Sequence, residues 1–492
     1  MHDAIMAMAG AGALALVVSA AEGARRLLDA PGTLTRRSVH LAAGVLGALV
    51  PWLFRSRWWP AGGAAAAVLA LYPSVRRGWL PALHAARPRS LGTVWFAVSA
   101  LLLYLVAWEQ PVLVCLPLLV LAFGDVAGSV VGSRMGTARP LPEPFRRRTW
   151  DGSFAVFVMT GLVVTVGWEA LGLGGPLSAV LVGLAVAPMV TAAEALSGEG
   201  LDNLTIPLAA GLTLQIVLSD PAGQPGALLA GEALGLAVAG AAWRWRVLDA
   251  GGAAGAFLIA GFVLGGGGWP WALPLAAFFL LSSALSLLRD RLRPGTAALA
   301  EKGSRRDIGQ VAANGGVPGL LFAAGVAGLP AVWIWPAFLG SVAAAAADTW
   351  GTEIGTMAGP RARLITTGER VPAGTSGGVT LAGTLGGIAG AAVVAGVGLL
   401  LPPGGTGAAG WAAGAAAAGG VAGTMADSLL GATLQGRYRC TVCGTVTERR
   451  RHCPGGPVER VRGLAGLTND GVNLAAGAVG AGTALLILLL AG

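Results

Sequence analysis

Two stretches of the chain place acidic side chains inside otherwise apolar sequence. Asp125 follows a long apolar run, and small residues come directly after it. The same frame, Asp-x-x-Gly-(Ser/Thr)-x-(Val/Ile)-Gly-(Ser/Thr), returns at Asp348. A carboxylate in a membrane segment is costly, and it marks a functional site by default. Two copies of one costly frame therefore predict two related sites.

Further acids and amides gather near both copies of the frame. In the first half they are Asp151, Glu194, Asp202 and Asn203, and in the second half Glu353, Asp427, Asp470, Asn469 and Asn473. Oxygen ligands without histidine or thiol suit Mg²⁺, which usually arrives with nucleotide phosphates. This composition predicts a magnesium site in each half.

Short Gly/Ser/Thr stretches accompany these acids. The amides and hydroxyls of Gly152-Ser153 and of Gly374-Thr375-Ser376-Gly377-Gly378 could hold phosphate oxygens. Arginines flank both stretches, at Arg146, Arg147 and Arg148 and at Arg361, Arg363 and Arg370, and could neutralise a transferred phosphoryl group. Taken singly, the glycines are explained by helix packing and the arginines by membrane topology. Their repeated coincidence with the acids favours a metal–phosphate site.

Two other groups of residues could carry chemistry. His40 and Gln310 each follow an arginine pair. A catalytic base at His40 and a hydrogen-bonded residue at a helix end stay open as alternatives. Cys440, Cys443, His452 and Cys453 lie in a short loop and have the residue types of a zinc knuckle. The alternative for this loop is a cluster of reduced thiols, because two of its members are adjacent in sequence.

The elements that must position these residues are membrane helices. The mean hydropathy is +0.70, with 55% hydrophobic and 12% charged residues, which is typical of a polytopic membrane protein. The net charge of +9 comes from residues scattered through short loops, which predicts helix orientation and no nucleic-acid partner. The apolar start lacks a basic segment, so we expect a first membrane helix and no cleaved signal.

About sixteen apolar runs are long enough to span a membrane. They lie near 4–23, 39–54, 58–74, 91–107, 112–133, 154–171, 177–196, 204–219, 227–242, 250–266, 270–288, 308–327, 332–358, 376–401, 408–434 and 467–490. With both termini on the outer side, all of the 33 basic residues except Arg55 and Arg57 fall inside. The sequence thus predicts an all-α protein of the cell inner membrane, with its sites facing the cytosol.

The matched stretches keep the same order in both halves, which predicts a parallel repeat. Residues 1–220 and 221–492 would form two related membrane domains joined by a turn at 220–226, and the cysteine-rich loop at 436–462 would be an insertion in the second. In this alignment Thr149-Trp150-Asp151-Gly152-Ser153 stands opposite Thr375-Ser376-Gly377-Gly378-Val379.

The first half resembles the CTP-dependent polyprenol kinase family, which includes phytol kinase and dolichol kinase. The resemblance lies in Gly124-Asp125, in Arg148-Thr149-Trp150-Asp151-Gly152-Ser153, and in Glu194 followed by Asp202-Asn203-Leu204. Arg148 and Asp151 stand where that family has Lys and Glu. Both keep the charge, although arginine presents a broader set of donors.

The second half resembles the family of plant phytyl-phosphate kinase, and the cysteine loop belongs to that pattern. The matching stretches are Lys302-Gly303-Ser304-Arg305-Arg306-Asp307, Gln310-Val311-Ala312-Ala313-Asn314-Gly315-Gly316, Ala347-Asp348-Thr349-Trp350-Gly351-Thr352-Glu353, Val371-Pro372-Ala373-Gly374-Thr375-Ser376-Gly377-Gly378-Val379-Thr380 and Asp427-Ser428-Leu429-Leu430-Gly431-Ala432-Thr433-Leu434-Gln435.

Together the resemblances imply a fusion of two consecutive lipid kinases. The first half would phosphorylate an isoprenoid alcohol such as phytol or geranylgeraniol with CTP and Mg²⁺, and the second would convert the monophosphate to the diphosphate. A cytidylyltransferase that makes a CDP-lipid and a transporter with tandem repeats stay open as alternatives.

The expected site residues fall into three sets. The catalytic or metal-binding acids are Asp125, Glu194, Asp202, Asp348, Glu353, Asp427 and Asp470. The nucleotide-binding residues are Arg148, Gly152, Ser153, Asn203, Gly374, Thr375, Ser376, Gly377, Asn469 and Asn473. The zinc ligands would be Cys440, Cys443, His452 and Cys453.

Overall fold

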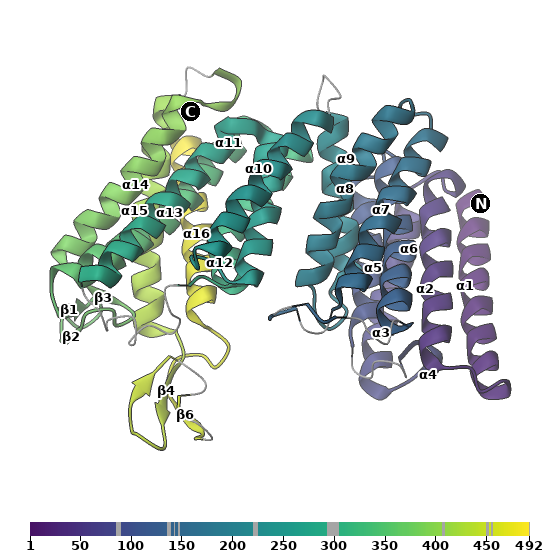
Figure 1. Ribbon diagram of the computed structural model, residues 1–492, viewed down its shortest axis with the longest axis horizontal. Helices are drawn as coiled ribbons and strands as arrows, with labels where there is room; N and C mark the ends of the chain where they lie inside the picture. The colour runs from purple at the N-terminus through teal and green to yellow at the C-terminus, as the bar shows by residue number, and fades with distance from the viewer. Residues whose placement is uncertain are drawn as a thin grey trace. The chain divides into compact units, whose positions relative to one another are not determined.

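The computed structural model is mostly helical (Figure 1). It describes residues 1–84, 90–134, 139–141, 143–145, 148–219, 225–292, 305–405, 409–448, 452–453 and 456–491. Several residues used to predict orientation or to align motifs lie outside these ranges: Arg87, Arg89, Arg146, Arg147, Arg293, Lys302, Gly303, Ser304, Arg449, Arg450 and Arg451.

The chain forms two compact units, Met1–Glu232 and Ala233–Gly492. The boundary between them falls within helix α10 (Pro225–Arg244). The sequence placed its domain boundary in the turn at 220–226, of which residues 220–224 lie outside the described ranges.

The first unit is built around one buried helix, α6 (Val112–Arg134). The side chains of Val114, Leu116, Leu118 and Leu121 on this helix have no exposed surface. Asp125 lies three residues after Ala122, which ends this buried run, so the helix carries a carboxylate to the edge of the core. The remaining helices of the unit are α1 (His2–Leu27), α2 (Gly32–Leu53), α3 (Trp58–Arg77), α4 (Pro81–His84), α5 (Gly92–Val106), α7 (Trp150–Ala170), α8 (Pro176–Leu196) and α9 (Asp202–Ser219).

The second unit repeats this plan around α13 (Ala331–Ala358). Its residues from Ile334 to Ala347 are buried, and Asp348 is the first partly exposed side chain after them. The helices α14 (Leu381–Leu400), α15 (Ala409–Thr433) and α16 (Asn469–Ala491) pack against it. The unit also contains α11 (Ala250–Leu292), α12 (Ile308–Val326) and a 3₁₀ turn at Pro403–Gly405.

Glycine spacing explains how closely the helices approach one another. A methyl group added at Gly152 would lie 3.1 Å from the carbonyl oxygen of Gly128, and one at Gly383 would lie 2.7 Å from that of Gly351. Such backbone approach requires small residues at the helix–helix contact. The frame that holds each acid is therefore also the surface on which the following helix packs.

Two small antiparallel sheets depart from the predicted all-α class. One has the strand order β2-β1-β3 and the other β5-β4-β6. Their bounds are β1 (Arg361–Leu364), β2 (Arg370–Pro372), β3 (Gly378–Val379), β4 (Arg437–Cys440), β5 (Val446–Thr447) and β6 (Val458–Arg462). These segments are too polar and too short to form membrane helices, and Figure 1 shows them beyond the helix ends of the second unit. The expected apolar run at 376–401 accordingly begins as a helix only at Leu381.

Nine helices within the described ranges are long and apolar enough to cross a membrane. One of them, α11, has 43 residues, about twice the length that a bilayer core requires. Its two helical segments join at Gly268, which has a positive φ of 68°, and they correspond to the two runs expected at 250–266 and 270–288. The chain is a multi-pass membrane protein, while sixteen spans and outer termini stay predictions.

Candidate functional site

A cavity of about 430 Å³ lies in the second unit. Residues of α11 to α16 and the loop between β2 and α14 line it. Asp348, Glu353, Asp427, Asn469 and Asn473 all face it, as do Gly374, Thr375, Ser376 and Gly377. The structure thus brings together nine residues that the sequence assigned to the second site. Asp470 at the start of α16 is partly buried and does not line this cavity.

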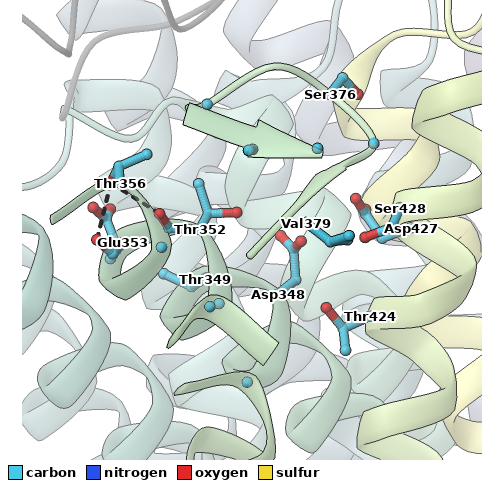
Figure 2. Close-up of a pocket in the computed structure, with 18 of the residues that line it drawn as sticks. Asp348, Thr349, Thr352, Glu353, Thr356, Ser376, Val379, Thr424, Asp427 and Ser428 are labelled. Atoms are coloured by element: carbon cyan, nitrogen blue, oxygen red, sulfur yellow. Dashed lines mark hydrogen bonds between the residues drawn. The ribbon is translucent and has the colours of Figure 1, made fainter. Parts of the chain in front are cut away.

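Two carboxyl groups face each other in the cavity. Figure 2 shows Asp348 on α13 and Asp427 on α15 in the same part of the pocket, with the side chain of Val379 drawn between them. Both side chains line the cavity. Like charges on two neighbouring carboxylates repel each other, and a divalent cation held between them would remove that repulsion. The pair is therefore a candidate cation site.

An amide from α16 completes this pair. With the amide group of Asn473 oriented to satisfy its neighbours, its nitrogen donates to Asp427 Oδ2 at 2.9 Å and to the carbonyl oxygen of Asn469 at 3.3 Å. Within the described part of the chain, no arginine or lysine forms a salt bridge with Asp348 or Asp427. The oxygen-only set is chemically suited to a hard divalent cation.

The glycine loop contains two residues in backbone conformations that favour glycine. Gly374 and Gly377 have φ values of 84° and 79°, a conformation that other residues rarely adopt. A methyl group at Gly377 would also lie 2.5 Å from the Cβ atom of Ala432. Two residues that follow α15 bind Ser376. Its hydroxyl donates to Gln435 Oε1 at 2.5 Å, and its carbonyl accepts from Arg437 Nη2 at 2.6 Å.

Glu353 has a different environment from the facing pair. Arg289 Nη1 lies 3.0 Å from Glu353 Oε2, and the Ser286 hydroxyl donates to Oε1 at 2.7 Å. Arg306 lies over the rings of Phe278 and Phe279, where burial lowers the pKa of its guanidinium and the charge of Glu353 opposes that shift. Glu353 is already neutralised by Arg289, so it fits a role in fixing arginines at the cavity wall.

In the first unit an arginine occupies the centre of the acidic group. Arg148 Nη1 lies 2.6 Å from Glu194 Oε1, and Nη2 donates to Asp202 Oδ2 at 2.8 Å. Burial alone would lower the pKa of Arg148, but the charges of Glu194 and Asp202 outweigh it and raise the pKa. The Ser153 hydroxyl also donates to Glu194, at 3.4 Å, and Asn203 donates to Asp202 Oδ1 and to the carbonyl of Gly200.

Asp125 lies apart from this ion-paired group, next to His40. His40 Nε2 is 3.8 Å from Asp125 Oδ2 and 3.3 Å from the carbonyl oxygen of Leu121. The side chain of Asp125 is 28% exposed, whereas Glu194 and Asp202 are nearly fully buried. Both interpretations of His40 are compatible with these contacts, because the ring lies near the acid and near a helix carbonyl.

The helix caps of the two units indicate a register that the sequence alignment missed. Thr149 caps α7 by accepting from the Gly152 amide at 3.1 Å, and Thr380 caps α14 by accepting from the Gly383 amide at 2.9 Å. The alignment of 149–153 with 375–379 is therefore wrong. The β1–β3 segment, which the first half lacks among its described residues, supplied a second stretch of similar Gly/Ser/Thr composition.

This corrected register shows what differs between the sites. Arg148 precedes Thr149, and Val379 precedes Thr380, so valine replaces the arginine in the second unit. Thr468 likewise precedes Asn469 where Asp202 precedes Asn203. At these positions the second unit therefore has neither the guanidinium nor the second carboxylate, and Asp348 and Asp427 line the cavity without an arginine at position 379.

Sequence reasoning missed Arg289, Gln435 and Arg437 as site residues. Arg289 and Arg437 were explained by topology, and Gln435 was recognised only as the end of a motif. In each case the partner, Glu353 or Ser376, is distant in sequence. No local pattern of residue types could have paired them.

The cysteine loop brings its four side chains to one point. One ligand atom from each of Cys440, Cys443, His452 and Cys453 lies within 4.8 Å of the others. The backbone N–H groups of Cys443 and Val442 lower the pKa of the Cys440 thiol to about 6. The cysteines are free rather than paired in disulfides.

Comparison with known proteins places the chain among membrane proteins. Residues 233–481, about half of the chain, match the model of the integral membrane protein family DUF92. The chain belongs to this family. It is also similar to the phytol kinase of Synechocystis sp., with 33% identity over 202 residues that make up 40% of this chain and 85% of that protein. No solved structure matches the chain.

These matches confirm part of the resemblance found in the sequence. The chain is a homologue of a phytol kinase and a member of an integral membrane family. The DUF92 match covers most of the second unit, including Asp348, Asp427 and the cysteine loop.

Proposed function

We propose that the chain is a bifunctional membrane kinase of isoprenoid alcohols. The first unit phosphorylates a prenol of the phytol or geranylgeraniol type, and the second phosphorylates the resulting monophosphate, with CTP as donor and Mg²⁺. The observation that carries this proposal is the facing Asp348–Asp427 pair in a cavity walled by the glycine loop. The phytol kinase relative supports the choice of a prenol as substrate.

The second site is suited to an acceptor that is already ionised. A prenyl monophosphate attacks the γ-phosphorus of the nucleotide with a phosphate oxygen, the bond from that phosphorus to the bridging oxygen breaks, and the nucleoside diphosphate leaves. No proton needs to be removed from the acceptor, so Asp348 and Asp427 are both available to hold a cation. Bound Mg²⁺ would neutralise charge on the nucleotide phosphates. The amides of Gly374, Ser376 and Gly377 would position the phosphoryl group.

The first site must instead deprotonate an alcohol. Arg148 forms ion pairs with Glu194 and Asp202. Asp125 is the more exposed carboxylate of the group and is not part of these ion pairs. Asp125 accepts the hydroxyl proton as the alcohol oxygen bonds to the γ-phosphorus and the nucleoside diphosphate leaves. His40 lies 3.8 Å from Asp125, where a protonated imidazole would stabilise the ionised carboxylate. Arg148, Ser153 and Asn203 shape the phosphate-binding side of the site.

The substrate chemistry gives a reason to join the two activities. A prenyl monophosphate is amphipathic and stays in the membrane, so two sites on the same side can pass it laterally. The distribution of basic residues supports placing both sites on the cytosolic side of the inner membrane. The apolar helices would hold the isoprenoid tail while the head group lies at the interface.

The test is a product analysis with detergent-purified protein, CTP, Mg²⁺ and phytol. Wild type should form the diphosphate, Asp125→Asn should form no lipid product from phytol, and Asp348→Asn should accumulate the monophosphate. Asp125→Asn should still convert added monophosphate. Glu169→Gln is the matched control, because Glu169 is an exposed carboxylate at the end of α7. Diphosphate from both aspartate variants would contradict the two-site assignment.

The same assay separates the two alternatives. A kinase releases CDP, whereas a cytidylyltransferase releases pyrophosphate and leaves a CDP-lipid. A transporter would turn over neither CTP nor phytol in detergent, where there are no compartments to move a solute between.

A further inference from the structure

The geometry assigns a structural zinc site to Cys440, Cys443, His452 and Cys453, and this site fixes the glycine loop of the second unit through the sheet that carries it. Three thiolates and one imidazole are the ligands of closed, tetrahedral zinc sites. The metal site stands independently of the proposed reaction. Only the phosphate-binding role of the glycine loop rests on the proposed function.

Two sulfur–nitrogen distances in the cluster are close to those of a tetrahedron around zinc. With metal–sulfur bonds of about 2.3 Å and metal–nitrogen bonds of about 2.0 Å, tetrahedral geometry separates S from N by about 3.5 Å and S from S by about 3.8 Å. His452 Nδ1 lies 3.3 Å from Cys443 Sγ and 3.5 Å from Cys453 Sγ. The adjacency of His452 and Cys453 in sequence therefore does not prevent both from reaching one ion.

The backbone around the first two cysteines forms a tight turn. The Gly444 amide donates to the carbonyl of Cys440 at 2.9 Å, and the Cys440 amide donates to that of Thr445 at 2.9 Å. Gly444 has a positive φ of 72°, which glycine adopts without strain. This turn directs the Cys440 and Cys443 sulfurs to the same side. Cys440 in β4 pairs with Val458 in β6, which fixes the register between these two antiparallel strands.

Without a metal ion, the sheet has few buried apolar side chains to stabilise it. Its strands β4, β5 and β6 have only 4, 2 and 5 residues. Val442, Val446 and Val461 are each at least half exposed, whereas Cys440 is fully buried. A sheet this small is marginal in water without further support. Metal coordination supplies folding free energy to domains that lack a core.

This sheet is the connection between two walls of the cavity. It leaves α15, which carries Asp427, and returns to α16, which carries Asn473. Two backbone hydrogen bonds join the chain where it enters and leaves the sheet. The Leu464 amide donates to the carbonyl of Leu434, and the Gly436 amide donates to that of Leu467. Gln435 and Arg437, at the start of β4, hold the hydroxyl and the carbonyl of Ser376. A zinc ion that closes the far end of the sheet would thus limit the movement of the glycine loop.

The test begins with metal content of the full chain purified without added metal. Elemental analysis should find about one zinc per chain in wild type, and Co²⁺ exchange should give the thiolate-to-metal charge-transfer and tetrahedral ligand-field bands of Co²⁺. Cys440→Ser and Cys443→Ser should lose the zinc. Cys115→Ala is the matched control and should keep it, because Cys115 is a free cysteine buried in α6.

The second measurement is amide hydrogen exchange at residues 373–380. Chelation of zinc from wild type should raise exchange there, and adding zinc back should restore protection, while α7 and α8 of the first unit should not change. This comparison needs no variant to fold and no activity, so its result is distinct from failure of the kinase proposal. Absence of zinc from wild type would overturn the metal site. Bound zinc whose removal leaves exchange at 373–380 unchanged would overturn its effect on the loop.

Discussion

The replacement of Arg148 by Val379 between the two units predicts what an arginine would do in the second site. In the first unit the guanidinium lies 2.6 Å from Glu194, and the position equivalent to Glu194 in the second unit is Asp427. In Val379→Arg the new side chain would pair with Asp427. It would have one carboxylate partner where Arg148 has two, because Thr468 stands at the position of Asp202. The guanidinium would then compete with the divalent cation for the facing pair.

The size of the effect follows from the charge separation. Two unit charges about 4 Å apart at an effective dielectric constant of about 20 interact with roughly 4 kcal/mol. Since about 1.4 kcal/mol corresponds to a factor of ten, and desolvating the arginine offsets part of the gain, the cation should bind roughly 10²-fold more weakly. The stability of the helices should change little, because Val379 is only partly buried at the cavity wall.

The assay is the initial rate of the second step, measured with a prenyl monophosphate and CTP over a range of Mg²⁺ concentrations. The Mg²⁺ concentration for half-maximal rate should rise by roughly 10²-fold in Val379→Arg. Val379→Met provides a long, uncharged side chain and should leave the half-maximal concentration close to that of wild type. The first step, assayed with phytol in the same samples, is an internal control. An unchanged Mg²⁺ dependence in Val379→Arg, or an equal shift in Val379→Met, would refute the reasoning.

Two further predictions concern stability. Arg148→Ala leaves Glu194 and Asp202 buried without their cation, so thermal unfolding in detergent should show a loss of about 3–5 kcal/mol, and Arg148→Lys a smaller one because it keeps the charge. A loss below about 1 kcal/mol in Arg148→Ala would show that the ion pairs are not formed. Gly383→Ala should cost about 1–3 kcal/mol because its methyl group would lie 2.7 Å from the carbonyl oxygen of Gly351. Gly396→Ala, on the same helix but with open space around it, should be neutral or stabilising by up to about 1 kcal/mol, and equal effects of the two would contradict the packing argument.

Much of the candidate site could be predicted from the sequence because its signals are local. Apolar length predicts a membrane helix at each run, and the Asp-x-x-Gly frame places Asp125 and Asp348 in the second halves of α6 and α13. The same frame carries the glycines on which α7 and α14 pack. Residue type and spacing along one helix are sufficient for these conclusions.

Other features depend on contacts that no local pattern contains. The register of the repeat was misread because Thr375 and Thr380 lie in similar Gly/Ser/Thr surroundings. The cap that Thr380 forms and the packing of Gly383 on Gly351 distinguish them. The two small sheets were missed for a related reason, since strands of 2 to 5 residues carry no periodic pattern.

The sequence by itself therefore determined the membrane class, the two acidic frames and the residue types at each site. Tertiary structure decided which charges meet: Arg148 with Glu194 and Asp202, Arg289 with Glu353, and Asp348 with Asp427 in one cavity. The physical reason is that burial and electrostatic pairing depend on distances between helices far apart in the chain. Hydropathy and spacing are properties of one helix at a time.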